Sequence, residues 1–179
     1  MCRKTKFADK EWKEKRVLTV DEQKRVEQVA LEFKNPLSFA VYLALYTGMR
    51  VGELGALRIS DVDFDNNEIH VRRTIARVHF PGCKTGRRTR LVINSPKTKK
   101  SIRNIPIPAF VAEKLKLYIA NTVRRREILK EIYRDYDVNY EPKKWVHEDL
   151  IFMTQLGTPF SVTDMNRKVL GGLLDVAGV

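Results

Sequence analysis

The sequence predicts an α+β fold that is mainly helical and contains a small three-stranded antiparallel sheet. Two observations lead to this prediction. Apolar residues recur with the period of a helix over roughly residues 19–57 and again from Ala109 onward. Over residues 68–108, by contrast, they alternate with polar residues at a period of two. At 179 residues, the chain is long enough for one domain with a sizeable core.

Three helices are expected before the strands. Thr19 and Glu22 have the spacing of a capping box, which predicts that the first helix begins there and runs to about residue 33. The second, roughly 36–46, is apolar nearly all round and should lie at the centre of the core, with Gly48 as its C-terminal stop. A short third helix follows over about residues 50–57.

The strands are expected at residues 68–78, 89–95 and 101–108, separated by polar turns. The segment between the first two, 81–88, carries two glycines and three cations and is expected to form an exposed loop tip. Together the three strands would form an antiparallel sheet with a basic, solvated face.

Helices are expected again after the sheet. A long amphipathic helix begins at Ala109, and the apolar segment 149–153 is expected to enter the core. A last helix begins near Ser161 or Thr163, either of which could cap it.

Positive charge is concentrated in the middle of the chain. The formal net charge is +12, and residues 71–103 contain eleven Lys or Arg but no Asp or Glu. Residues 1–16 form a second basic segment, whereas the rest of the chain is slightly acidic. Such a one-sided distribution favours a polyanionic partner, and nucleic acid is the usual one. A solvated basic loop without a partner is the alternative.

Several classes of protein are disfavoured by what the sequence lacks. No apolar run is long enough to span a membrane, and the first residues do not resemble a signal peptide. Cys2 and Cys83 are too few for a disulfide framework or a zinc cluster. A cytoplasmic protein is therefore expected.

Arg50 is an unusual residue for its position. It follows a Thr-Gly break and lies at or next to a helix N-terminus, where the helix dipole disfavours a cation. A bound phosphate would reverse that effect, and the guanidinium group could hold two phosphate oxygens. The alternative is a structural arginine paired with Glu53 or with an aspartate of residues 60–65.

Three lysines, Lys97, Lys99 and Lys100, lie in the turn between the last two predicted strands. A hairpin tip can reach into a groove, and a lysine there can contact phosphate or donate a proton. A turn that only contacts phosphate is the alternative.

These two stretches together resemble the tyrosine recombinases, or phage-type integrases. "YTGMRVGELGAL" (46–57) is similar to the family's first arginine box, and "SPKTKKSIRNIPIP" (95–108) is similar to its lysine hairpin. The resemblance covers roughly residues 17–179. The two motifs are most similar to those of the integrases of conjugative transposons and Gram-positive phages.

The resemblance implies cleavage and rejoining of double-stranded DNA through a covalent phosphotyrosine, with no cofactor and no metal. Arg50 would bind the scissile phosphate, Lys97 would be the general acid for the 5′-oxygen, and Glu53 would stabilise the helix. The complete enzyme would act as a tetramer on DNA, and this chain alone would be a monomer or a weak dimer. The other cations expected to contact DNA are Arg72, Arg73, Arg87, Arg88, Arg90, Lys99, Lys100 and Arg103.

The family's His-x-x-Arg box and its nucleophilic tyrosine have no match in this sequence. The stretch "HVRR" (70–73) precedes the lysine hairpin, and residues 70 and 73 of a strand point to opposite faces. We therefore expect residues 1–16 to be a basic arm or linker and residues 17–179 to be the N-terminal part of a catalytic domain, incomplete at its C-terminus. Such a chain should bind DNA without cleaving it.

Two other functions are compatible with the sequence. A non-catalytic nucleic-acid-binding module could use the arginine and lysine boxes only as phosphate clamps. An RNA-binding protein of the ribosomal type would fit the charge but not the Thr-Gly-x-Arg box.

Overall fold

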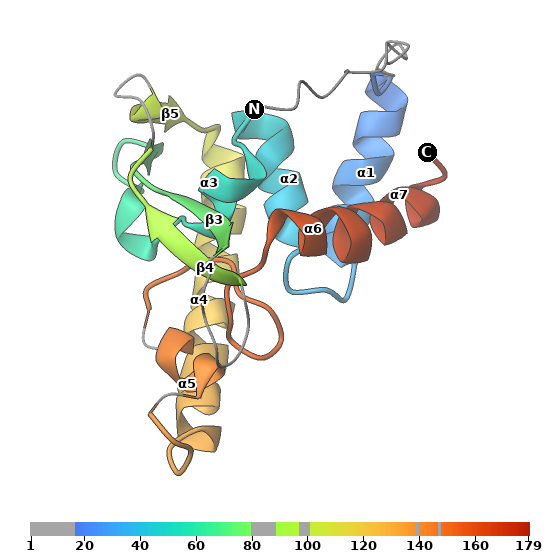
Figure 1. Ribbon diagram of the computed structural model, residues 1–179. Helices are drawn as coiled ribbons and strands as arrows, with labels where there is room; N and C mark the ends of the chain where they lie inside the picture. Colours follow the sequence, from blue (N-terminus) through green and yellow to red (C-terminus); the bar gives the residue numbers. More distant parts are fainter. Residues whose placement is uncertain (1–16, 80–88, 97–100, 139, 147) are drawn as a thin grey trace, which may run out of the picture.

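The computed structural model describes residues 17–179, apart from 80–88, 97–100, 139 and 147. Helices form most of this part of the chain, and all the strands lie between α3 and α4 (Figure 1). The helices are α1 (Val20–Glu32), α2 (Ser38–Thr47), α3 (Val51–Gly55), α4 (Ala109–Ile132), α5 (Glu141–Val146), α6 (Val162–Asp164) and α7 (Gly171–Ala177), with the 3₁₀ turn η1 (Ile59–Asp61) and the π-helical segment η3 (Met165–Leu170). The strands are β1 (Val62–Asp63), β2 (Glu68–Val71), β3 (Thr74–His79), β4 (Thr89–Asn94) and β5 (Arg103–Pro106).

The predicted capping box begins α1. The Thr19 hydroxyl accepts a hydrogen bond from the Glu22 N–H at 3.3 Å, and the Glu22 carboxylate accepts one from the Thr19 N–H at 2.8 Å. These two bonds satisfy N–H groups that a helix start leaves without intrahelical partners. Val26 and Ala30 are buried, and α1 packs against α2 and α7 (Figure 1).

Helix α2 lies at the centre of the core, as its apolar sequence predicts. Residues 39–43 are buried, and the Phe39 ring stacks on Tyr118 of α4 with the ring centroids 4.7 Å apart. Gly48 ends the helix with φ of 60°, a left-handed conformation that glycine adopts without steric penalty. The segment 150–153 is also completely buried, which confirms that it enters the core.

The strands are arranged differently from the single sheet predicted. Residues 68–78 form two strands: β2 pairs with β1 and β5 in a three-stranded antiparallel sheet, and β3 pairs with β4 in a separate two-stranded ribbon. The predicted single strand is wrong because the chain changes partners at Arg72 and Arg73. The alternation of Ile69, Val71 and Ile75 is interrupted at Arg73, and this interruption is the sign of the change that the sequence carries.

Helix α4 continues well beyond its apolar first half. Its polar second half remains helical to Ile132, and Leu129 packs with Tyr133 and Val146 of α5 in a small second cluster. Figure 1 shows α5 beside the end of α4 that lies away from α2 and α3.

The last helical segment begins at Ser161, one of the two predicted caps. The Ser161 hydroxyl accepts a hydrogen bond from the Asp164 N–H at 3.2 Å. From there α6, η3 and α7 follow one another as a continuous rod that reaches α1 (Figure 1), and Arg25 of α1 donates to the Ala177 carbonyl at 3.0 Å.

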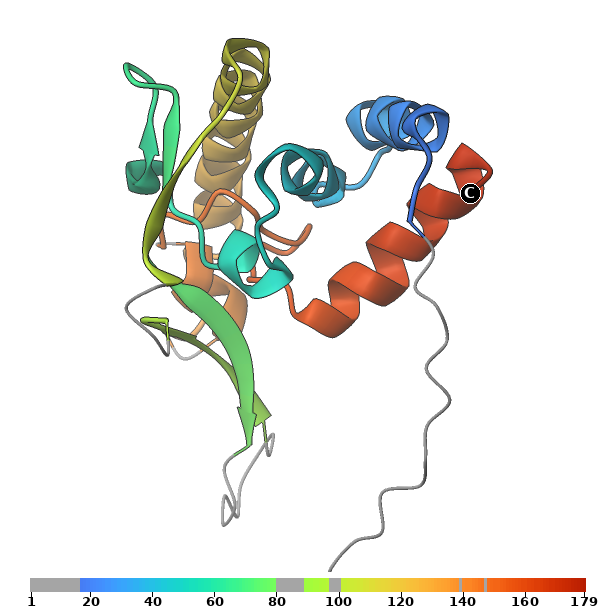
Figure 2. The same ribbon diagram turned by 90° about the horizontal axis from the view of Figure 1, so that it is seen from above.

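Seen from above, the β3–β4 ribbon projects away from the helical body (Figure 2). Within the described residues, no helix has both the length and the apolar character needed to cross a membrane. The same residues contain no group of three or more His, Cys, Asp or Glu placed to hold a metal ion.

Candidate active site and basic surface

Arg50 caps the N-terminus of α3 with its side chain directed outward. Its backbone is extended (φ −71°, ψ 149°), and its side chain is 75% exposed. The Arg50 N–H donates to Glu53 Oε2 at 2.9 Å, and Nη1 donates to Glu53 Oε1 at 3.1 Å. Arg50 therefore contacts a carboxylate while most of its guanidinium remains accessible to a ligand.

Glu53 is the buried centre of this arrangement, with a side chain only 4% exposed. Arg103, the first residue of β5, donates to both of its oxygens, Nη1 to Oε1 and Nη2 to Oε2, each at 2.9 Å. This bidentate pair ties α3 to the strand that follows the lysine turn. The three side chains carry two positive charges and one negative charge, so a surplus of one positive charge remains, and Arg50 is the exposed cation.

The pKa of Glu53 reflects these contacts. Burial alone raises the pKa of a carboxyl group, but the hydrogen bonds from Arg103 and from the Arg50 N–H, and the charge of Arg103, outweigh it. The pKa of Glu53 is consequently lower than its ordinary value, and the carboxylate stays ionised at neutral pH.

Helix α3 can hold Arg50 in this place because it packs closely on β3. A Cβ atom at Gly52 would lie 2.7 Å from Thr74 Oγ1 and 2.9 Å from the Ile75 carbonyl oxygen. Both distances are shorter than real Cβ contacts, so only glycine permits this approach. The "VGELG" sequence of α3 is therefore fitted to the strand beneath it.

The predicted DNA-contacting residues fall into three groups. Lys97, Lys99, Lys100, Arg87 and Arg88 lie outside the described residues.

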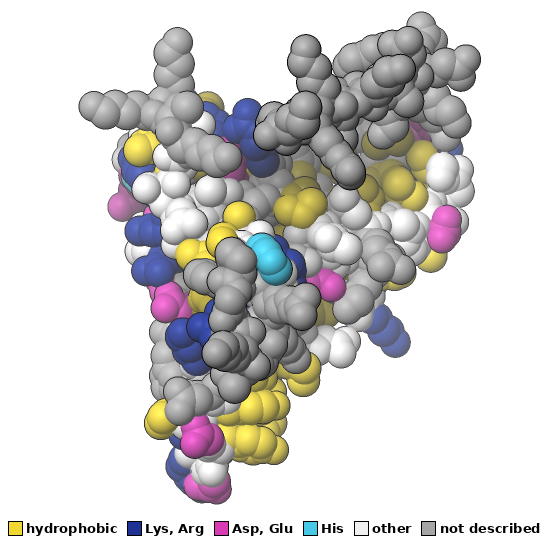
Figure 3. Space-filling model, viewed as in Figure 1, with side chains coloured by type: hydrophobic (Ala, Val, Ile, Leu, Met, Phe, Trp, Pro, Cys, Tyr) yellow, Lys and Arg dark blue, Asp and Glu magenta, His cyan; other side chains and the backbone are white. Residues whose placement is uncertain are grey.

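Arg72, Arg73 and Arg103 are held by other side chains. Arg103 binds Glu53, Arg72 donates to Asn104 Oδ1 at 3.0 Å, and Arg73 Nη1 donates to both oxygens of Asp61 at 2.7 and 2.8 Å. Arg90 of β4 forms the third group; like Arg72 and Arg73, it lines a cavity of about 670 Å³ beside this strand. Figure 3 shows Lys and Arg along the strand side of one face, with acidic side chains among them.

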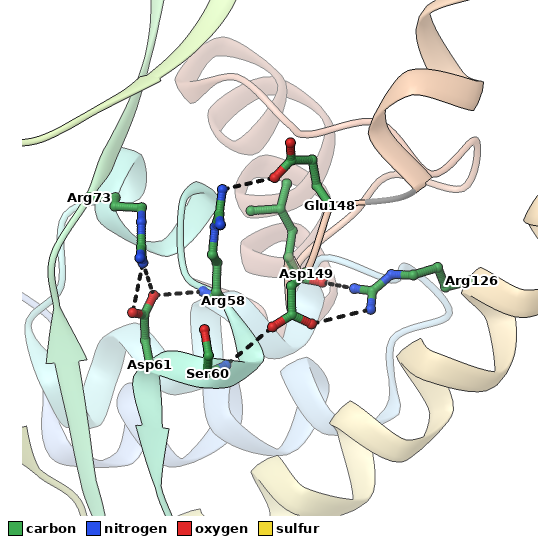
Figure 4. Close-up of polar contacts among 8 residues, drawn as sticks. Arg58, Ser60, Asp61, Arg73, Arg126, Glu148 and Asp149 are labelled. Atoms are coloured by element: carbon green, nitrogen blue, oxygen red, sulfur yellow. Dashed lines mark hydrogen bonds and ion pairs between the residues drawn. The ribbon is translucent and has the colours of Figure 1, made fainter. Parts of the chain in front are cut away.

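A polar network that the sequence did not predict lies next to this surface (Figure 4). Asp61 accepts from Arg73 and also from the Arg58 N–H at 3.0 Å, and Arg58 Nη2 donates to Glu148 Oε2 at 2.8 Å. Asp61, in the 60–65 segment, thus pairs with Arg73, while Glu53 pairs with Arg50. The network fixes the link between β2 and β3 against the segment before residue 150.

The second half of the network is centred on Arg126 of α4 (Figure 4). This side chain is buried; it donates to the Leu150 carbonyl, and its Nη1 lies 3.6 Å from Asp149 Oδ1. Asp149 also accepts from the Ser60 N–H at 3.4 Å. The signal in the sequence is spacing: Arg126 lies at helical intervals from Thr122 and Leu129, and the structure buries all three on one face of α4.

None of the six tyrosines is arranged as a nucleophile beside Arg50. Tyr46 donates to Glu27 at 2.8 Å, and Tyr118 donates to the Pro36 carbonyl, with burial raising its pKa to about 12. Tyr42 is buried in α2. The remaining three, Tyr133, Tyr136 and Tyr140, form a cluster near α5 in which Tyr136 and Tyr140 stack and Tyr133 meets both edge to face. Figure 1 shows α5 away from α3.

The "HVRR" stretch does not bring its histidine and arginine together. His70 lies in β2, with Nε2 3.9 Å from Glu68 Oε2, whereas Arg73 follows the strand and binds Asp61.

The sequence is similar to proteins that recombine DNA. The model of the phage integrase family matches residues 16–171. A XerC-like tyrosine recombinase of Caldanaerobacter subterraneus subsp. tengcongensis is 34% identical over 140 residues, which are 76% of this chain and 32% of the relative. The integrase of Staphylococcus phage L54a is 30% identical over 130 residues, 73% of this chain and 31% of that protein. The chain thus spans about a third of the length of these curated relatives.

Solved structures share the fold at lower sequence identity. The Tn1549 transposon integrase in complex with transposon right end DNA superposes with a TM-score of 0.62 at 23% identity, covering 88% of this chain and 44% of that one. The XerA recombinase superposes with a TM-score of 0.56 at 21% identity, covering 97% and 46%. The fold is that of tyrosine recombinase catalytic domains, mostly helical with small antiparallel sheets, and the chain belongs to the phage integrase family.

Proposed function

We propose that this chain forms part of a site-specific recombinase that cleaves and rejoins DNA through a covalent phosphotyrosine. One observation carries the proposal: Arg50 is 75% exposed, while Glu53, its acidic partner among the described residues, is 4% exposed and shared with Arg103. The pair therefore leaves a positive charge on the surface at a fixed position. A DNA phosphate is the ligand whose charge and geometry fit it.

Arg50 acts in this proposal as a clamp on the scissile phosphate. Its guanidinium can donate to phosphate oxygens while Nη1 keeps its bond to Glu53. Arg103 neutralises Glu53, so the carboxylate does not cancel the charge of Arg50. When the phosphate becomes pentacoordinate, the negative charge on its oxygens increases, and a preorganised cation stabilises that charge.

Lys97 is proposed as the general acid. The tyrosine Oη attacks phosphorus, the bond to the 5′-oxygen breaks, and Lys97 transfers a proton to that oxygen. A 5′-sulfur leaving group needs no such proton, so it should restore cleavage by Lys97→Ala in the full-length protein. Cleavage that stays low with sulfur would remove this role.

The nucleophile is proposed to be a tyrosine other than the six in this chain, since each of those lies in the core or in the cluster near α5. The chain is accordingly proposed to bind duplex DNA without cleaving it. We also propose that the full-length protein acts as a tetramer on DNA and that this chain alone is at most a weak dimer. Sedimentation with and without DNA measures both states, and a stable tetramer of the chain alone would contradict the second.

A nicked suicide duplex tests the reaction. Such a substrate traps the covalent intermediate because the short cleaved strand diffuses away. The full-length protein should give a protein–DNA adduct that resists denaturant, and this chain should retard the duplex without forming one. An adduct with this chain would place the nucleophile among its six tyrosines. Failure of the full-length protein to form any adduct on its own recombination site would remove the proposed reaction.

A further inference from the structure

A second basic site lies beside β4, separate from Arg50. The open cavity of about 670 Å³ is lined by residues 90–95 together with Arg58, Lys144 and Trp145. Arg50, Glu53 and Arg103 do not line it. The site is therefore independent of the candidate active site.

The cavity is strongly positive. Five of its lining side chains are cationic, Glu148 is the one lining carboxylate, and Asp61 lies behind Arg73. Counting both acids, a net charge of about +3 remains, which favours a ligand with several negative charges. The cations come from the segment after α3, the β2–β3 link, β4 and α5, so the fold brings together residues that are far apart in sequence.

Trp145 adds an aromatic surface to this charge. Its ring is partly exposed and lines both this cavity and the neighbouring one of about 1090 Å³, which also includes Tyr140. Arg90 and Lys144 line both cavities as well. A cationic groove combined with an aromatic platform is the arrangement that proteins use to hold single-stranded nucleic acid, with the backbone along the cations and a base on the ring.

The shape of the site also fits an extended strand. Six consecutive residues of β4 and its end line it, and at about 3.3 Å per residue they span roughly 17 Å. A stacked strand advances about 3.4 Å per nucleotide, so this length holds at most about five nucleotides, and fewer when the strand is extended. A duplex keeps its bases stacked inside, so only an unpaired strand can place a base on Trp145.

We propose that the groove formed by β4, Lys144 and Trp145 binds a single strand of DNA, with one base stacked on Trp145. The choice of DNA rather than RNA rests on the proposed function, and the rest of the inference does not. In a recombinase, such a groove would hold a strand that cleavage has freed.

Fluorescence of Trp145 tests the site directly in the 179-residue chain. The chain has two tryptophans, so Trp12→Phe leaves Trp145 as the only reporter. Titration with a ten-nucleotide oligo-dT should quench its emission, and a ten-base-pair duplex should quench it far less. Unchanged emission with oligo-dT, equal quenching by the duplex, or tighter binding of oligo-U would each overturn the proposal.

Variants measured by fluorescence anisotropy of labelled oligo-dT separate stacking from charge. Trp145→Ala should weaken binding by about fivefold or more, and Trp145→Phe, which keeps a ring, should retain most of the affinity. Lys144→Ala should make the log–log salt slope less negative by about 0.7. The matched control is Lys116→Ala, an exposed lysine on α4 that lines neither cavity.

Equal losses for Lys144→Ala and Lys116→Ala, or full affinity in Trp145→Ala, would contradict the proposal. A thermal melt of each variant shows whether it folds. If Trp145→Ala does not fold, the single variants Trp145→Phe and Lys144→Ala still test the site. Because no cleavage is measured, a negative result here leaves the recombinase proposal standing, and a failed cleavage assay leaves this one standing.

Discussion

Glu53 joins the two sequence boxes of this protein. Its carboxylate accepts from Arg50, three residues before it, and from Arg103, fifty residues after it. The first contact could be expected from sequence, since the i, i+3 spacing at a helix start favours it. The second could not, because nothing in an alternating pattern tells which cation of a basic segment meets a buried acid. For the same reason, Arg73 could be predicted as a surface cation but not as the partner of Asp61.

Glu53→Gln should change the acid stability of the chain. The pKa of Glu53 is lowered in the folded state, so the carboxylate stabilises the fold above its ordinary pKa near 4.5. This contribution is lost as the pH falls through the lower folded value. We expect the free energy of unfolding of the unaltered chain to fall more steeply than that of Glu53→Gln below about pH 4.5, when urea unfolding is followed by circular dichroism.

The matched control is Glu113→Gln on the exposed face of α4. Its pH profile should follow that of the unaltered chain. Parallel profiles for Glu53→Gln and the unaltered chain would mean that the Arg103 pair does not hold the carboxylate ionised.

At the level of elements, the helices could be predicted from sequence much better than the sheets. Thr19, Gly48 and Ser161 mark helix ends by local chemistry, and the structure uses each of them as predicted. The strands depend on partners. The chain changes sheets between β2 and β3, and the pairing on each side depends on Arg73 binding Asp61 and on α3 packing on β3. These are long-range contacts that periodicity does not record.

Gly52→Ala should destabilise the chain through the contact between α3 and β3. The added Cβ would lie 2.9 Å from the Ile75 carbonyl oxygen, which is backbone and cannot rotate away. We expect a loss of about 1 to 3 kcal/mol in the free energy of unfolding, as for other overpacked sites. Denaturant unfolding measures it.

Gly171→Ala is the comparison for this prediction. It lies in a helix, and a Cβ there meets only the Asn166 carbonyl oxygen at an ordinary 3.7 Å. Alanine favours helix more than glycine does, so this variant should be unchanged or up to about 1 kcal/mol more stable. Equal effects of the two substitutions would argue against close packing of α3 as the cause.

On the scale of the whole molecule, the distribution of charge can be read from the sequence alone. The net charge of +12 and its concentration in residues 71–103 predict a polyanionic partner, and the family membership is consistent with DNA. The structure adds that several of these cations are already bound to acids or amides, so fewer are available to a polyanion than a simple count implies.

Binding of duplex DNA by the 179-residue chain should weaken steeply with salt. Each phosphate neutralised contributes about −0.9 to the slope of log affinity against log salt concentration. Fluorescence anisotropy over a series of salt concentrations gives this slope. We expect the slope to correspond to fewer neutralised phosphates than the eleven basic residues of 71–103. A flat response would exclude this segment as a DNA-binding surface.

The central claim is that Arg50 acts on the phosphate during cleavage and does more than hold the DNA. Single-turnover cleavage of a suicide duplex by the full-length protein, with the affinity for the same duplex measured in parallel, tests it most directly. For Arg50→Ala we expect the cleavage rate to fall about 100-fold or more, as when one donor to a developing charge is removed, while the affinity changes only a few-fold. Equal losses in rate and affinity, or a cleavage rate that does not change, would contradict that role.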